Sequence, residues 1–179
     1  MTNVQTAVLG GGCFWCLEAV FDQTEGVLSV ESGYMGGHMQ RPTYRQVCEG
    51  NTGHAEVIRV TFDPQKIRFG DLLEVFFAIH DPTTLNRQGN DVGTQYRSVI
   101  FYNSEEQKKQ AEQAIARLNA SKELPGPVVT AVEPAAEFFL AEDYHQEYFA
   151  SNPDQPYCQL VVAPKVRKFQ KKFSERMKA

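Results

Sequence analysis

The strongest constraint in this sequence is a glycine-rich turn between an apolar run and an amphipathic stretch. The apolar run is Val4–Leu9, the glycines are Gly10–Gly12, and Cys13 precedes the stretch Phe14–Asp22. This pattern predicts a strand, a turn and a helix, because consecutive glycines tolerate positive φ and close backbone approach. Cys13 then lies at the helix N-terminus, where unpaired N–H groups favour a thiolate over a thiol. We therefore expect either a nucleophilic thiol or an inert buried cysteine there.

Three other interpretations of this turn are a phosphate cradle, a dithiol and a zinc site. The turn lacks both the Gly-Lys-Ser/Thr ending and the wider Gly-x-Gly-x-x-Gly pattern, which disfavours phosphate. Cys13 and Cys16 form a C-x-x-C whose members share a helix face within disulfide reach, so a thioredoxin-like dithiol stays open. Cys48 and Cys158 are isolated and the four histidines lack ligand spacing, so we expect no metal.

Length and composition indicate one domain, which we place at residues 1–179, with a core at about 4–164 and a basic tail helix at 165–178. The chain has 179 residues, of which 42% are hydrophobic and 22% charged, as is usual for a globular protein. The net charge of −4 argues against a general nucleic-acid or membrane binder.

Targeting features and cysteine usage indicate a cytoplasmic protein. Met1–Thr6 lacks the basic and apolar regions of a signal peptide, and no apolar run approaches the ~18 residues of a membrane span. Four cysteines are too few for a disulfide scaffold in a chain of this size. We therefore expect a reducing, cytoplasmic compartment.

The stretch Ala55–Phe62 alternates as a half-buried strand does. Glu56 shares its parity with Ile58, Val60 and Phe62, so its carboxyl lies on the apolar face. Burial raises a carboxyl pKa and would keep this acid protonated and able to donate a proton near neutral pH. The alternative is an edge glutamate that reaches solvent.

Other patterns predict further strands and helices interspersed along the chain. The expected strands are Val27–Tyr34, Tyr96–Tyr102, Val128–Val132 and Leu160–Val162; the expected helices contain Phe69–Phe77, follow the capping box at Ser104, and span about Asp143–Ala150. We therefore expect an α+β domain: a mixed sheet with a ferredoxin-like, plait-type core, helices packed against it, long irregular loops and an irregular C-terminal segment.

Two aperiodic loops, residues 33–44 and 82–95, are candidates for a functional site, because long loops in compact domains are usually functional or disordered. Tyr34 and Tyr44 in the first loop are either hydroxyl donors at a site or anchors of the loop.

Four segments together resemble the peptide methionine sulfoxide reductase A family. They are Gly12-Cys13-Phe14-Trp15, Gly53-His54-Ala55-Glu56, His80-Asp81-Pro82-Thr83 and Gln88–Ser98. The resemblance runs in order from about Val4 to Pro164, and no second, B-type reductase domain is recognisable.

The resemblance implies reduction of methionine (S)-sulfoxide, free or in proteins, without a cofactor and with thioredoxin as the electron donor. Cys13 would attack the sulfoxide sulfur, and Glu56 would protonate its oxygen, with Tyr44 and Tyr96 hydrogen-bonding that oxygen. A protonated carboxyl and phenols suit this chemistry, since a sulfoxide oxygen leaves poorly until it is protonated.

The resemblance also implies substrate-binding residues. Phe14 and Trp15 would form the pocket for the methyl group, and Asp91 would act in a polar network beside it. His54 and Gly53 would shape the turn before the catalytic acid. We expect a monomer that binds oxidised proteins and thioredoxin, but neither nucleic acid nor membranes.

The product on the nucleophile would be a sulfenic acid, which a second thiol condenses to a disulfide. Some family members carry two cysteines in a C-terminal tail, whereas this chain has only Cys158 there. Cys158, in an irregular segment able to swing toward Cys13, is our first choice as the resolving cysteine. Cys16 is the second choice, and Cys48 is expected to be a small buried hydrophobe.

Two alternatives to the reductase remain. A dithiol–disulfide oxidoreductase would use Cys13 and Cys16 but leave Glu56 and the tyrosines without a role. A non-enzymatic module would recognise oxidised methionine or another partner through Trp15 and the basic tail.

Overall fold

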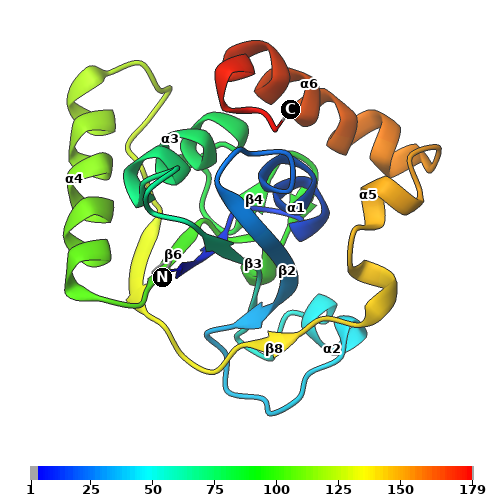
Figure 1. Cartoon of the computed structure of the whole chain (residues 1–179). Coiled ribbons are helices and arrows are strands. Elements are labelled where there is room, and N and C mark those ends of the chain that lie inside the picture. Colours follow the sequence, from blue (N-terminus) through cyan, green and yellow to red (C-terminus); the bar gives the residue numbers. More distant parts are fainter. Residues whose placement is uncertain (1–3, 179) are drawn as a thin grey trace.

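A six-stranded sheet runs through the middle of the molecule in the computed structural model, which describes residues 4–178 (Figure 1). Its strands, in spatial order, are β7 (Ala131–Pro134), β6 (Val99–Tyr102), β1 (Gln5–Gly10), β3 (Ala55–Phe62), β2 (Val27–Met35) and β8 (Phe139–Leu140). Neighbours are antiparallel except β6 and β7, which are parallel. The expected single domain with a mixed sheet is confirmed. Residues 1–3 and residue 179 lie outside the described residues. The first three belong to the stretch that is predicted to lack a signal peptide.

The helices mostly cover one face of this sheet. They are α1 (Phe14–Phe21), α2 (Tyr44–Cys48), α3 (Phe69–Ile79), α4 (Glu105–Ser121), α5 (Tyr148–Ser151) and α6 (Ala163–Lys172). The main core joins α1, α3 and α6 to the sheet through buried side chains such as Leu9, Ile58, Leu72 and Phe169. A smaller cluster around Val57 and residues 131–138 covers the other face.

The alternation in β3 orients Glu56 as predicted. Ile58, Val60 and Phe62 are fully buried in the core under the helices, and Ala55 and Val57 belong to the cluster on the opposite face. The central position of β3, between β1 and β2, explains why both of its faces are buried.

The glycine turn after β1 is as tight as the sequence indicates. Gly12 has a φ of +91°, and a Cβ there would lie 2.9 Å from the side chain of Gln88. A Cβ at Gly11 would lie 2.9 Å from the His80 ring. A side chain at either position would collide, because Gly12 packs against the short hairpin of β4 (Arg87–Gln88) and β5 (Asp91–Val92), and Gly11 packs against the end of α3.

The C-terminal segment differs from the prediction. The expected strand Leu160–Val162 is wrong, because a π-helical turn, Cys158–Val162, leads directly into α6. Cys158, Val162, Val166 and Phe169 recur every three or four residues and are buried, so they form the apolar stripe of one continuous helix. Pro164, which resembles a helix breaker in the sequence, is tolerated in the first turn of α6.

Other elements begin or end at residues that differ from the prediction. The strands predicted from Tyr96 and Val128 begin three residues later, at Val99 and Ala131, because residues 94–96 form a 3₁₀ turn and residues 128–130 are irregular. The helix expected at about 143–150 is divided into a 3₁₀ turn, Asp143–His145, and α5, because Glu147 adopts a left-handed φ of +53°. The predicted tail helix ends at Lys172, and Arg176 beyond it pairs with Asp71 of α3 at 3.3 Å.

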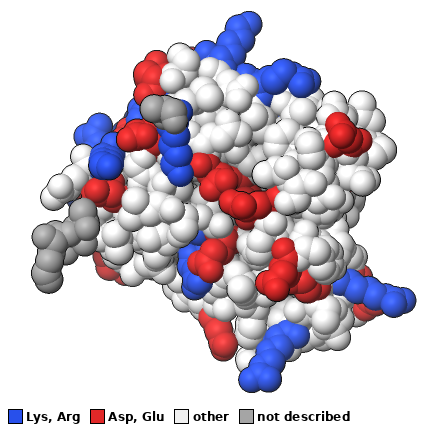
Figure 2. Space-filling view, turned by 45° about the vertical axis from the view of Figure 1, so that its right-hand side comes forward, with Lys and Arg blue, Asp and Glu red and all other residues white. Residues whose placement is uncertain are grey.

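Charges of both signs are distributed over the surface. Figure 2 shows Asp and Glu side chains near the centre of one face and Lys and Arg side chains mostly at its edges. None of the helices within residues 4–178 is both long and apolar enough to cross a bilayer.

We predict that the C-terminal helix contributes strongly to stability. Phe169 is fully buried, so Phe169→Ala should lower the free energy of unfolding by about 3–5 kcal/mol, measured by urea denaturation. Leu160 in the preceding turn is 78% exposed, and Leu160→Ala should change it by less than about 0.5 kcal/mol. Equal losses for the two variants would contradict the docking of this helix.

Candidate active site

Cys13 occupies the N-cap of α1, immediately after the glycine turn. Its backbone is extended, with φ −69° and ψ 130°, and the residue is only 6% exposed. The Gly12 N–H donates to the Tyr96 carbonyl at 3.2 Å, and the Cys16 N–H donates to the Cys13 carbonyl at 3.1 Å. The thiol is thus fixed at the start of the helix and nearly closed off from water.

Burial outweighs the helix terminus in setting the state of this thiol. Burial raises the pKa of Cys13, its hydrogen bond to Cys16 and the nearby Glu56 raise it further, and the Trp15 N–H acts in the opposite direction. Burial therefore acts against the thiolate that the helix N-terminus is predicted to favour. The pKa of Cys16 is lowered chiefly by that hydrogen bond, with a smaller contribution from Lys165.

Glu56 lies next to the N-terminus of α1 with its two carboxyl oxygens in different situations. The residue is 1% exposed, and Oε1 accepts the Phe14 N–H at 3.2 Å. Within residues 4–178, Oε2 has no hydrogen-bond partner. Burial raises the pKa of Glu56 to about 8, with the Phe14 N–H acting against the rise. The predicted desolvation is confirmed, and the solvent-exposed alternative is wrong.

Tyr44 and Tyr96 approach this carboxyl from two further elements, the start of α2 and a 3₁₀ turn at Thr94–Tyr96. Burial raises the pKa of both phenols, and the Glu56 charge is the next contributor in each case. The same two side chains act to lower the pKa of the Cys48 thiol, while burial raises it. Cys48 is exposed, so the expectation that it is a buried hydrophobe is wrong.

A set of stacked rings surrounds Trp15. The Trp15 ring lies parallel to Tyr148, with centroids 3.8 Å apart, and Nε1 donates to Nδ1 of His145 at 3.0 Å. Phe14 is fully buried, and its ring lies 5.2 Å from His145. Sequence reasoning missed His145 and Tyr148, for which the only indication was a short predicted helix.

Glu142 joins the two tyrosines of the first candidate loop. Its Oε1 accepts the Tyr34 hydroxyl at 2.9 Å, and its Oε2 accepts the Tyr44 N–H at 3.0 Å. Partial burial acts to raise the pKa of Glu142, but these hydrogen bonds bring it below its ordinary value. Tyr34 is therefore an anchor of the loop, and Glu142 holds Tyr44 beside Glu56.

Asp91 and Tyr157 link the hairpin to the segment that carries Cys158. The Tyr157 hydroxyl donates to Oδ2 of Asp91 at 2.6 Å, and Tyr157 acts to lower the pKa of the Cys16 thiol. Cys158 is fully buried, and burial raises its pKa, followed by the charge of Cys16. Cys16 is therefore the thiol that neighbours both Cys13 and Cys158.

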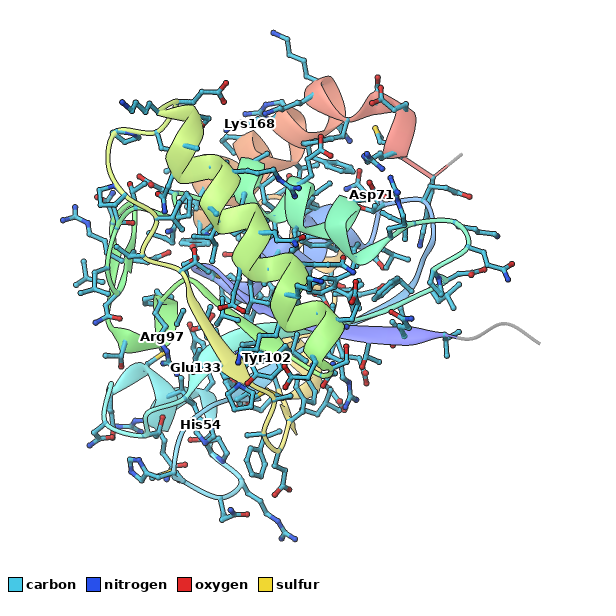
Figure 3. All side chains as sticks on the ribbon, turned by 90° about the vertical axis from the view of Figure 1, so that its left-hand side faces the viewer. His54, Asp71, Arg97, Tyr102, Glu133 and Lys168 are labelled. Carbon is cyan, nitrogen blue, oxygen red and sulfur yellow. The ribbon has the colours of Figure 1, made fainter. Side chains whose placement is uncertain are left out.

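His54 braces a loop and does not face the thiol. Its Nδ1 accepts the Gly37 N–H at 3.0 Å, and its Nε2 lies 2.7 Å from the Met39 carbonyl, so the neutral ring donates there. Arg97 donates to the Gly53 carbonyl at 3.1 Å, which ties the Tyr96 turn to the turn before Glu56. Figure 3 shows Arg97 and His54 at the end of the molecule away from Lys168 of α6.

A metal site is not apparent among the side chains of residues 4–178, where no three His, Cys, Asp or Glu side chains gather as ligands would. The chemistry available to the site is that of a thiol beside a protonated carboxyl and two phenols.

Comparison with known proteins assigns the family. Residues 5–177 match the family model described as peptide methionine sulfoxide reductase. The chain is 57% identical to the peptide methionine sulfoxide reductase MsrA of Chromobacterium violaceum, over 96% of this chain and 97% of that protein. It is 53% identical to the protein of the same name from Saccharolobus solfataricus, over 98% of each chain. The chain belongs to the peptide methionine sulfoxide reductase family.

Solved structures of reductases agree with this assignment. Mxr1 from Saccharomyces cerevisiae in reduced form matches with a TM-score of 0.79 and 34% identity, over 87% of this chain and 89% of that one. Methionine sulfoxide reductase A of Corynebacterium diphtheriae matches with a TM-score of 0.75 and 36% identity, over 86% and 77%. The protein is therefore a peptide methionine sulfoxide reductase in sequence and in fold.

We predict that Glu56 makes the reductase less stable as pH rises. A carboxyl with an unfolded pKa of 4.5 and a folded pKa of about 8 is protonated only in the folded state between these values. Stability is therefore lost across that window, and Glu56→Gln should gain in relative stability between about pH 5 and about pH 8. Urea unfolding of both proteins at each pH measures the gap; a gap independent of pH would contradict a neutral Glu56.

Proposed function

We propose that this reductase acts on methionine (S)-sulfoxide, free and in proteins, with Cys13 as the nucleophile and Glu56 as the proton donor. The observation that carries the proposal is the Glu56 carboxyl: it is buried, its raised pKa keeps it protonated near neutral pH, and its Oε2 has no hydrogen-bond partner among residues 4–178. A neutral acid with a free oxygen beside a thiol is what the reduction of a sulfoxide requires.

The first step converts the thiol to a sulfenic acid. Cys13 loses its proton and its sulfur attacks the sulfoxide sulfur, while Glu56 donates a proton to the oxygen and Tyr44 and Tyr96 hydrogen-bond that oxygen. The new bond between the two sulfurs and the S–O bond of the substrate then break as the hydroxyl passes to the Cys13 sulfur, so methionine leaves and Cys13 ends as S–OH. The proton lost by the thiol balances the one that Glu56 gave, and Glu56 is protonated again. Because the resting thiol is protonated, bound substrate has to drive the loss of its proton.

The second step removes the sulfenic acid. A resolving thiol attacks Cys13, water leaves, and a disulfide forms. We propose Cys158 for this role and Cys16 as the alternative. Cys158 lies buried in a π-helical turn, a feature frequent at functional sites, so this turn has to open for its sulfur to reach Cys13.

A thioredoxin dithiol then reduces the disulfide and is itself oxidised. This proposal is supported by the structure of Mxr1 from Saccharomyces cerevisiae determined in complex with Trx2. The methyl group of the substrate would lie against Trp15, with Phe14 behind it, and Asp91 would complete the polar side of the site. A monomer in the cytoplasm that needs no metal or cofactor stays our prediction.

The sheet core is, we propose, of the ferredoxin-like plait type. The order β6-β1-β3-β2, antiparallel throughout, and the position of α1 and α3 on one face support this assignment.

The activity is tested with the two epimers of N-acetyl-methionine sulfoxide and dithiothreitol. We expect turnover of the S epimer only, and its loss in Cys13→Ser, because a hydroxyl at this position is a far weaker nucleophile than a thiol. Glu56→Gln should retain binding but lose about 10²–10⁴-fold in rate. Equal turnover of both epimers, or activity in Cys13→Ser, would contradict the proposal.

The resolving cysteine is tested by separating one turnover from cycling. Cys158→Ser should release one equivalent of methionine at the normal rate but stop cycling with thioredoxin, because no intramolecular disulfide forms. Cys48→Ser is the matched control and should still cycle with thioredoxin.

If Cys16→Ser stops thioredoxin cycling and Cys158→Ser does not, the resolving role passes to Cys16. Full cycling in both single variants would contradict both assignments.

A further inference from the structure

Glu18 is a second buried acid, one helical turn after Trp15 on α1, and it has no part in the steps above. The residue is 2% exposed, and its Oε1 accepts the Glu147 N–H at 2.6 Å. Burial raises the pKa of Glu18 to about 7, and the backbone N–H groups of Glu147 and Tyr148 act against the rise. The carboxyl therefore caps the N-terminus of α5 from a different helix.

The capped turn is a strained one. Glu147 has a φ of +53°, an uncommon conformation for a residue other than glycine, and it directly precedes Tyr148. Such a conformation persists only where neighbouring contacts impose it. The Glu18 carboxyl is the contact made by the Glu147 N–H, so it fixes the direction in which the chain enters α5.

The residue that follows this turn forms one wall of the aromatic site. Tyr148 stacks on Trp15 with ring centroids 3.8 Å apart and an interplanar angle of 10°. His145, from the same segment, accepts the Trp15 N–H at 3.0 Å. α1 thus holds this segment at two places, by the Trp15 ring and by the Glu18 carboxyl.

We propose that Glu18 is a positioning residue for substrate binding: its carboxyl holds the Glu147–Tyr148 turn so that Tyr148 packs flat on Trp15 and completes the pocket for the methyl group. The inference rests on the proposed function, because Trp15 has its binding role only there. Glu18 lies outside the reacting groups, so its loss should weaken binding and leave the chemical step intact.

The test is a comparison of Glu18→Met with Glu18→Gln. Met fills the same volume but leaves the Glu147 N–H unpaired, whereas Gln keeps an oxygen that accepts it. With dithiothreitol as reductant, Glu18→Met should raise KM for N-acetyl-methionine (S)-sulfoxide about tenfold with kcat within about twofold, and Glu18→Gln should stay within about twofold in both. Glu112→Met, on the exposed side of α4, is the control and should change neither.

Fluorescence supplies a readout that does not depend on activity. Trp15 is the only tryptophan of the chain, so its emission reports the stack with Tyr148 directly. Emission should shift to longer wavelength in Glu18→Met as water reaches the ring, and should remain unchanged in Glu18→Gln. Glu18→Asp, one methylene shorter, should show a smaller shift and a smaller rise in KM, and it carries the test if Glu18→Met does not fold.

Two outcomes would overturn the proposal. One is a folded Glu18→Met or Glu18→Asp with unchanged KM and unchanged Trp15 emission. The other is an equal loss in Glu18→Gln, which would mean that the acceptor oxygen is irrelevant. Absence of turnover in the wild type would instead count against the proposed function, and the emission of the variants would still test the packing of Tyr148.

Discussion

The hydrogen bond from the Phe14 N–H to Glu56 is the contact on which the site depends. It joins the first N–H of α1 to the strand that lies between β1 and β2, so one interaction sets the helix against the sheet and places the Glu56 carboxyl next to the residue that follows Cys13. A helix N-terminus normally favours a carboxylate. For Glu56, burial raises the pKa more than the Phe14 N–H lowers it, so the carboxyl keeps its proton while that N–H still fixes its position.

The same preference for neutral groups extends through the site. The thiol of Cys13, the carboxyl of Glu56 and the phenols of Tyr44 and Tyr96 all have raised pKa values because water is largely excluded. Ionising any one of them in such surroundings is costly without a partner. A sulfoxide supplies one, since its oxygen gathers negative charge as the thiol loses its proton. Under the proposed mechanism a neutral thiol is less open to direct oxidation than a thiolate, because the thiolate is the reactive form.

Sequence reasoning located the parts of the site that lie within regular or glycine-marked structure. The glycine turn, the alternation of β3 and the four family segments predicted Cys13, Glu56 and their neighbours, because each follows from a local period or a steric requirement. Glu142, His145 and Tyr148 were missed because they contact residues about 100 or more positions earlier in the chain, through single hydrogen bonds and ring contacts. The tail helix was predicted, but its start before residue 165 was missed because a proline in a first helical turn and a proline that ends a strand look alike in sequence.

The segment from β8 to α6 contributes several side chains to the site that no local sequence pattern predicts. It has little core of its own and is held to α1 and α2 by polar and aromatic contacts: Glu142 to Tyr44, His145 and Tyr148 to Trp15, and the Glu147 N–H to Glu18. Segments with few buried apolar contacts open at lower free energy than the core. Cys158 follows at the end of this segment, where α6 begins to pack on the main core. The cysteine proposed to resolve the sulfenic acid therefore lies between the segment held by these polar and aromatic contacts and the helix packed on the main core. If it moves toward Cys13 as proposed, the contacts of Trp15, Tyr44 and Glu18 restrain that movement.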